Sequence, residues 1–214
     1  MPNDNLEKLD SFLAKYPCQK GILSTVIPLN NKVQRQIRAL PFHINILDAS
    51  TPIPIKNCYK TPQTLGTDRL AVAVAAAIQF PKKDVLIIDS GTCITFELVT
   101  ALGEYLGGNI SPGINMRLKA LNHDTGQLPL EESKGNIPDL GYNTETAIRS
   151  GVINGIKYEI EGYIHSLRKK YPSLLILLTG GNHFNFDSQL KSDIFADKFL
   201  VLRGLNYILR YNDP

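Results

Sequence analysis

Asp84-Val-Leu-Ile-Ile-Asp-Ser-Gly-Thr-Cys-Ile-Thr95 gives the clearest indication of how this chain folds. Its first residues are apolar on both faces, which is typical of a strand inside a sheet, and the abrupt polar turn Asp89-Ser-Gly-Thr-Cys93 follows directly. Further strands are expected at 94–99 and 105–110. This segment therefore predicts an antiparallel meander.

Helices and strands flank this meander on both sides. Before it, the periodicity predicts a helix, strand, helix and strand at 5–15, 20–28, 31–39 and 44–47. After it, we expect helices at 113–122 and 144–167, a buried strand at 174–178, and short helices at 188–196 and 202–210. Asn143 or Thr144 is expected to cap the long helix. The pattern indicates an α/β protein.

The 214 residues are enough for one large domain or two small lobes. An Ala-rich helix is expected at 68–80, and Pro81-Lys82-Lys83 ends it. We place a lobe boundary there, which divides the chain into residues 1–82 and 83–214.

Composition argues against several classes of protein. The 23 basic and 20 acidic residues are evenly distributed, so nucleic acid is not an expected partner. No apolar run approaches the ~20 residues of a membrane span, and the N-terminus has no signal-peptide pattern, so we expect a cytoplasmic protein without a membrane partner. The three cysteines and four histidines are dispersed, which favours neither a disulfide framework nor a zinc site.

Two glycine turns follow predicted buried strands. In the first turn, Asp89 can hold a cation, Gly91 lets the backbone approach a phosphate, and Thr92 offers amide and hydroxyl donors. The alternative is an ordinary hairpin in which Asp89 binds its own turn. Thr179-Gly-Gly-Asn182 leaves the same choice open. Together the two turns favour a nucleotide-binding protein.

Gly66-Thr67-Asp68-Arg69 precedes the Ala-rich helix. Asp68 can accept a proton from a substrate hydroxyl, and the guanidinium of Arg69 can bind a carboxylate or phosphate. The alternative is a plain helix cap with a surface ion pair.

These motifs, in this order, resemble type III pantothenate kinases across about residues 20–210. The resemblance rests on Tyr59-x-x-Pro62 with Gly66-Thr67-Asp68-Arg69, Asp89-Ser-Gly-Thr-Cys-Ile-Thr95, Gly107-Gly-Asn-Ile-Ser-Pro-Gly113, Leu128-Pro129, Asn143-Thr144 with Ala147-Ile148, and Thr179-Gly-Gly181. Each motif is weak alone, but their joint order is specific.

The resemblance implies two ribonuclease-H-like lobes in the actin-like ATPase architecture of the acetate and sugar kinase superfamily. It also implies a homodimer that phosphorylates pantothenate to 4′-phosphopantothenate, the first step of coenzyme A biosynthesis. The reaction would use ATP with Mg²⁺ and a monovalent cation, K⁺ or NH₄⁺.

The resemblance also implies roles for single residues. Asp68 would be the catalytic proton acceptor, and Asp89 would bind the monovalent cation. Further pantothenate contacts would come from Tyr59, Gly66, Thr67, Arg69 and Thr144, of which Thr144 could serve the partner subunit's site. ATP contacts would come from Gly91, Thr92, Gly180 and Gly181.

The sequence departs from the family in one respect, because it contains no Asp-x-Gly-Asn-Thr turn, the family's first phosphate loop. We therefore expect an N-terminally truncated first lobe. The alternative function is a catalytically impaired pseudokinase or ligand-binding module. A transcriptional accessory role, a label sometimes attached to this family, has no support from the balanced charge.

Overall fold

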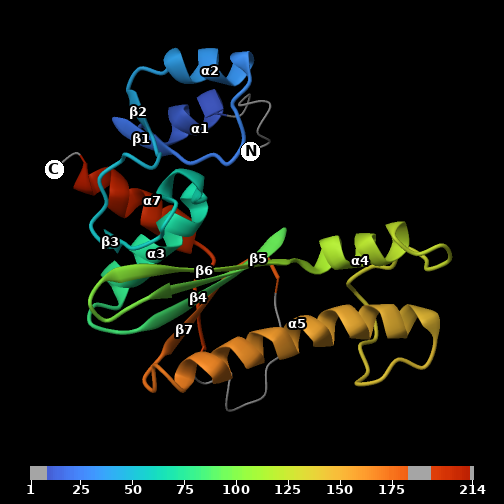
Figure 1. Ribbon diagram of the computed structural model, residues 1–214. Helices are drawn as coiled ribbons and strands as arrows, with labels where there is room; N and C mark the ends of the chain where they lie inside the picture. The colour runs from blue at the N-terminus through green and yellow to red at the C-terminus, as the bar shows by residue number, and fades with distance from the viewer. Residues whose placement is uncertain (1–8, 183–193, 213–214) are drawn as a thin grey trace.

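The computed structural model describes residues 9–182 and 194–212. Its largest feature is a mixed six-stranded sheet with the strand order β3-β6-β5-β4-β7-β8 (Figure 1). The strands are β3 (Lys56–Asn57), β4 (Val85–Ser90), β5 (Cys93–Val99), β6 (Glu104–Pro112), β7 (Leu175–Gly180) and β8 (Ile194–Ala196). The predicted meander is confirmed, since β5 pairs antiparallel with both β4 and β6. β7 lies parallel to β4 on the other side.

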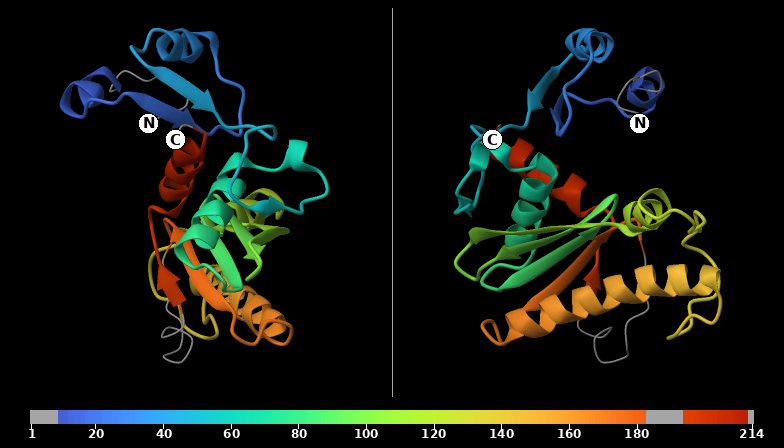
Figure 2. Two further views of the ribbon diagram at one scale, coloured as in Figure 1. Left: turned by 90° about the vertical axis from the view of Figure 1, so that its left-hand side faces the viewer. Right: turned by 45° about the vertical axis from the view of Figure 1, so that its right-hand side comes forward.

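Helices cover both faces of this sheet. α3 (Thr67–Gln79) and α7 (Leu200–Tyr211) pack on one face, and α5 (Thr144–Arg168) runs along the other (Figures 1 and 2). The two helices on the first face touch closely, because a Cβ atom at Gly204 would lie 1.8 Å from the carbonyl oxygen of Ala71. α3 is Ala-rich because it is enclosed by the sheet and α7.

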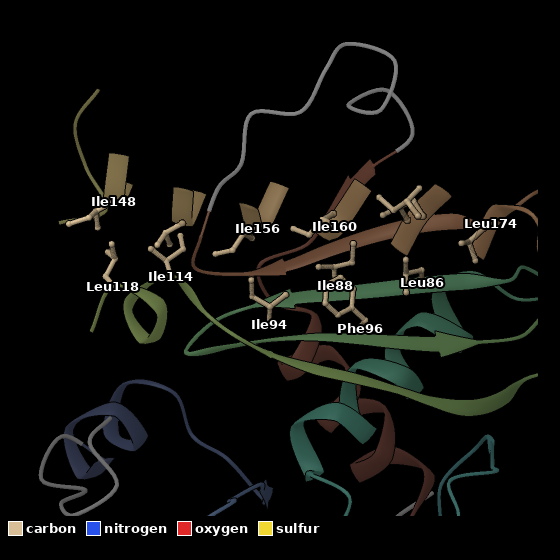
Figure 3. Packing of buried hydrophobic residues seen from close by; sticks show 13 residues of the cluster. Leu86, Ile88, Ile94, Phe96, Ile114, Leu118, Ile148, Ile156, Ile160 and Leu174 are labelled. Carbon is tan, nitrogen blue, oxygen red and sulfur yellow. The ribbon is translucent and has the colours of Figure 1, made fainter. Parts of the chain in front are cut away.

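The main apolar core lies between α5 and the sheet. Figure 3 shows Ile156 and Ile160 of α5 directed toward Ile88, Ile94 and Phe96 of the sheet. Nearer its N-terminus, α5 packs on α4 (Ile114–His123). Asn143 caps α5 in a reciprocal capping box with Thr146, which confirms the first of the two predicted caps.

A smaller unit lies beyond α7 (Figure 2). Here α2 (Asn31–Arg38) connects β1 (Lys20–Leu23) to the parallel strand β2 (His43–Ile46), so the predicted β-α-β order is confirmed. α1 (Leu9–Lys15) is the described part of the helix expected at 5–15. No described helix is long and apolar enough to cross a membrane.

The structure differs from the sequence-based expectations at several points. The helix expected at 188–196 is wrong over Ile194–Ala196, which extends the sheet beside β7, while residues 188–193 lie outside the described residues. The two-residue strand β3 and the 3₁₀ turn η1 (Pro62–Thr64) were not predicted. α3, expected in the first lobe, packs on the six-stranded sheet.

Candidate active site

The two glycine turns lie side by side at one edge of the sheet. β4 and β7 are parallel and in register, with Asp89 opposite Thr179 and Ser90 opposite Gly180. The backbone N–H groups of Gly181 and Asn182 donate to the Ser90 carbonyl at 3.0 and 3.2 Å. The side-chain amide of Asn182 also donates to that carbonyl, at 3.1 Å. The structure therefore joins the two turns into one loop cluster.

Gly180 is required for this close approach. Its φ is +95°, a region that favours glycine, and a Cβ atom there would lie 2.4 Å from the Ser90 carbonyl oxygen. Gly181 is different, because a Cβ atom at this position would meet nothing within 4 Å. The fold therefore requires glycine at position 180 but has room for a side chain at position 181.

A cavity of about 410 Å³ opens over the joined turns. Its lining combines both turns with the first half of α4 and consists of Ser90, Gly91, Thr92, Asn115, Met116, Lys119, Gly181 and Asn182. Sequence reasoning missed Lys119, which supplies the cavity with a positive charge. Its place in the helix opened by Pro112-Gly113, directly after the meander, is the signal that could have identified it.

Asp89 carries a perturbed carboxyl group. Burial, followed by the negative charges of Asp68 and Glu97, raises its pKa to about 6. These effects disfavour the bare carboxylate, and a bound cation would relieve them. Asp89 thus suits a cation ligand, and Asp68 lies close enough for its charge to be felt.

Asp68 occupies the first turn of α3, where Oδ1 accepts the backbone N–H of Arg69 at 2.8 Å. The N-cap position belongs to Gly66 and no side chain forms a cap hydrogen bond there, so the plain helix cap considered from the sequence is not formed. Thr67 is anchored separately, because its hydroxyl lies 2.7 Å from the hydroxyl of Ser24, just after β1. Gly66 precedes the helix, and a Cβ atom there would lie 2.6 Å from Asp68 Oδ1.

Arg69 does not form the surface ion pair that was considered from the sequence. Its side chain is buried and binds Glu97 of β5 through Nε at 2.5 Å and Nη2 at 2.9 Å. Burial alone would lower the pKa of Arg69, but the hydrogen bonds and charge of Glu97 outweigh it and raise that pKa. The Tyr59 ring faces the guanidinium at 5.5 Å. Two nitrogen atoms of the Arg69 guanidinium, Nε and Nη2, therefore already donate hydrogen bonds to Glu97.

Thr144 lies elsewhere, at the start of α5. It lines a separate cavity of about 1020 Å³ between α4, α5 and the loop that joins them. None of the other predicted site residues contributes to this lining. Within one chain, the structure therefore brings together the residues of α3, β4 and β7 but not Thr144.

Comparison with known proteins gives consistent results. A family model described as type III pantothenate kinase matches residues 3–166. A protein of Bacteroides fragilis named type III pantothenate kinase is 57% identical over 99% of this chain and 87% of its own length. Proteins with the same name are 54% identical in Phocaeicola vulgatus, with the same coverage, and 39% identical in Porphyromonas gingivalis, over 99% of this chain and 88% of the relative.

The fold also has a solved counterpart. A Campylobacter jejuni structure described as a Baf-family transcriptional activator superposes with a TM-score of 0.59. That alignment covers 95% of this chain and 88% of the other at 24% identity, so it supports the fold alone.

Proposed function

This chain belongs to the type III pantothenate kinase family, and on that premise we propose that it transfers the γ-phosphoryl group of ATP to the primary hydroxyl of pantothenate. The product is 4′-phosphopantothenate, and the reaction opens coenzyme A biosynthesis. The observation that carries this proposal is the arrangement of Asp68 and Asp89 beside the joined glycine turns.

Asp68 acts as the general base in this scheme. Its carboxylate accepts the proton of the pantothenate hydroxyl while the hydroxyl oxygen bonds to the γ-phosphorus and the bond from that phosphorus to the β-phosphate oxygen breaks. ADP leaves with the electron pair of the broken bond. The contact between Asp68 Oδ1 and the Arg69 amide holds the carboxylate at the start of α3.

The triphosphate lies in the cavity over the joined turns. Gly91, Gly180 and Gly181 provide backbone that a phosphate can approach, and Thr92 provides donors. Lys119 neutralises phosphate charge from α4. Asp89 holds the monovalent cation, and Mg²⁺ bound with ATP supplies further charge neutralisation. The raised pKa of Asp89 supports this role, because a cation stabilises its ionised form.

Pantothenate binds beside Asp68, with Tyr59, Gly66, Thr67 and Arg69 around it. Thr144 joins this site from the partner subunit of a homodimer. Two observations support the dimer: Thr144 lies away from Asp68 in its own chain, and the loop before it exposes large apolar side chains, with Leu140 87% and Tyr142 71% exposed.

Two ribonuclease-H-like lobes, residues 1–82 and 83–214, are the architecture we propose. The strand order β6-β5-β4-β7-β8, in which β7 and β8 extend the antiparallel meander as parallel strands beside β4, supports the second lobe. The parallel β1-α2-β2 unit beyond α7 supports a separate first lobe. α3 contacts both units, since it packs on the larger sheet and its Ala71 and Val74 also pack in a cluster with Leu47, directly after β2.

The decisive experiment for the kinase is pantothenate-dependent ADP release by the parent and by Asp68→Asn. We expect the substitution to lower turnover by a factor of about 10² to 10⁴, because Asn cannot accept the proton, while the far-UV circular dichroism stays unchanged. Turnover within about threefold of the parent would show that Asp68 is not the general base and refute the mechanism.

A further inference from the structure

Glu97 is a completely buried carboxylate beneath the start of α3. Its exposed fraction is 0%, and it projects from β5 on the face that α3 covers. Three hydrogen bonds satisfy it: two from Arg69, at 2.5 and 2.9 Å, and one from the Tyr105 hydroxyl at 2.6 Å. The Tyr105 ring is also fully buried and stacks on Tyr59.

A continuous chain of contacts leads from this carboxylate to Asp68. Glu97 holds both oxygens against the planar guanidinium of Arg69, a two-point contact that fixes the side chain in orientation as well as position. The backbone N–H of the same Arg69 is the donor to Asp68 Oδ1. One residue of α3 is thus fixed to the sheet by its side chain and to the Asp68 carboxylate by its amide.

The fold itself does not demand an ion pair here. Neighbouring positions on this face of the sheet, such as Val99 and Ile87, are apolar and buried. Buried ion pairs contribute little net stability compared with well-packed apolar residues of similar volume, because both charges lose their hydration. The ion pair fixes the orientation of the Arg69 side chain, and Arg69 is the residue next to Asp68.

We propose that Glu97 is a positioning residue for phosphoryl transfer, acting through Arg69 to hold the Asp68 carboxylate where it meets the substrate hydroxyl. This inference rests on the proposed function. It further means that Arg69 serves the reaction through its anchored backbone and not only through a substrate contact.

The test compares Glu97→Gln with the parent in steady-state ADP-release assays. Gln keeps the size of the side chain but loses the charge that holds Arg69, so we expect kcat to fall about 10- to 100-fold while KM for ATP changes less than about twofold. Glu104→Gln is the matched control, since Glu104 lies on the neighbouring strand and pairs with the exposed Lys56. We expect it to leave kcat unchanged.

A double-variant comparison separates positioning from general stability. If Glu97 acts through Asp68, then adding Glu97→Gln to Asp68→Asn should reduce the residual turnover by less than about twofold. A reduction as large as that in the parent background would overturn the proposal. So would a Glu97→Gln protein whose melting temperature falls while kcat is unchanged.

Tyr105→Phe provides a second route should Glu97→Gln fail to fold. It removes one hydrogen bond to the carboxylate and leaves the ion pair intact, and we expect kcat to fall about two- to tenfold, again only when Asp68 is present. An equal effect with and without Asp68 would refute the inference. A parent protein that releases no ADP would instead refute the proposed function, so the two failures are distinguishable.

Discussion

At the scale of single residues, three neighbouring carboxylates have different environments. Glu97 forms an ion pair with Arg69 and accepts a hydrogen bond from Tyr105, whereas Asp68 accepts a backbone N–H in the first turn of a helix. Asp89 is buried near both negative charges, and its pKa is raised to about 6. Identical chemical groups therefore differ in burial and charge balance because of what surrounds them, which agrees with the separate roles proposed for them above.

The first prediction concerns Asp89→Asn and pH. The folded-state pKa of about 6 lies above the ordinary value of 3.8, so the folded protein binds this proton more tightly than the unfolded chain does. The stability of the parent should therefore fall as pH rises from about 4 to about 6, and this loss should persist above that range. Because Asn does not titrate, the Asp89→Asn protein should not lose this stability as the pH rises.

Thermal unfolding without K⁺ or NH₄⁺ checks this prediction. We expect Asp89→Asn to melt above the parent at about pH 7.5 and at the same temperature at about pH 4. In activity assays the same variant should lose its dependence on K⁺ and show a higher KM for ATP. A constant difference in melting temperature at every pH would contradict the assignment of the raised pKa.

The second prediction concerns Lys119. Replacing it with Ala removes a positive charge from the cavity over the two turns, so KM for ATP should rise about tenfold while KM for pantothenate is unchanged. Lys83→Ala is the control, because Lys83 is exposed and precedes β4 at the end opposite the turn. If both variants have the same KM for ATP, Lys119 does not contact the nucleotide.

At the scale of elements, the site depends on the parallel pairing of β4 with β7. Parallel neighbours end at the same edge of a sheet, so turns separated by about 90 residues in sequence become adjacent. The Asn182 side chain ties them by donating to the carbonyls of Ser90 and Gly91. The two turns form one loop cluster because β4 and β7 pair in this register.

The two glycines of the second turn give a prediction at this scale. Gly180→Ala forces a side chain into positive φ and against the Ser90 carbonyl, so we expect a loss of about 1–3 kcal/mol of stability and a weakened affinity for ATP. Gly181→Ala meets nothing within 4 Å and should cost less than about 0.5 kcal/mol. Urea unfolding and nucleotide titration of both variants provide the measurement. Equal losses would show that the close approach of the strands is not what requires glycine.

In the molecule as a whole, Thr144 lies apart from the other residues of the candidate site, which is why a homodimer is part of the proposed function. Its cavity lies between α4 and α5, whereas Asp68 is in the first turn of α3, the helix on the face of the sheet opposite α5 (Figure 1). In a two-fold symmetric dimer, the same surface of each copy forms the interface. Each of the two sites can therefore combine residues of both chains.

Mixing impaired variants in equal amounts tests this arrangement. A dimer of one Asp68→Asn and one Thr144→Ala subunit retains one site with both residues intact, so random mixing should restore about a quarter of the parent activity. A mixture of Asp68→Asn with Asp89→Asn is the control and should gain nothing, because both residues belong to the same chain's site. Absence of any gain in the first mixture would mean that Thr144 does not complete the partner's site.

Much of the fold was predictable because it depends on local patterns. The short run of apolar residues at 85–88 is typical of a buried strand, and Asn143 with a helical periodicity to residue 167 defined α5 within one or two residues. Local propensity failed where tertiary contacts decide the outcome. β3 and β8 have two and three residues and are strands only because β6 and β7 present unpaired edges to them.

The candidate chemical groups of this protein were identifiable from the sequence, since the motifs around Asp68, Asp89 and Gly180 are short and contiguous. Which of these side chains contact one another depends on the folded chain. Burial of Glu97 against Arg69, the reach of Lys119 over the two turns and the separation of Thr144 from Asp68 depend on strand register and helix packing. Charge and exposure of a side chain are properties of its surroundings, and those surroundings come from residues distant in sequence.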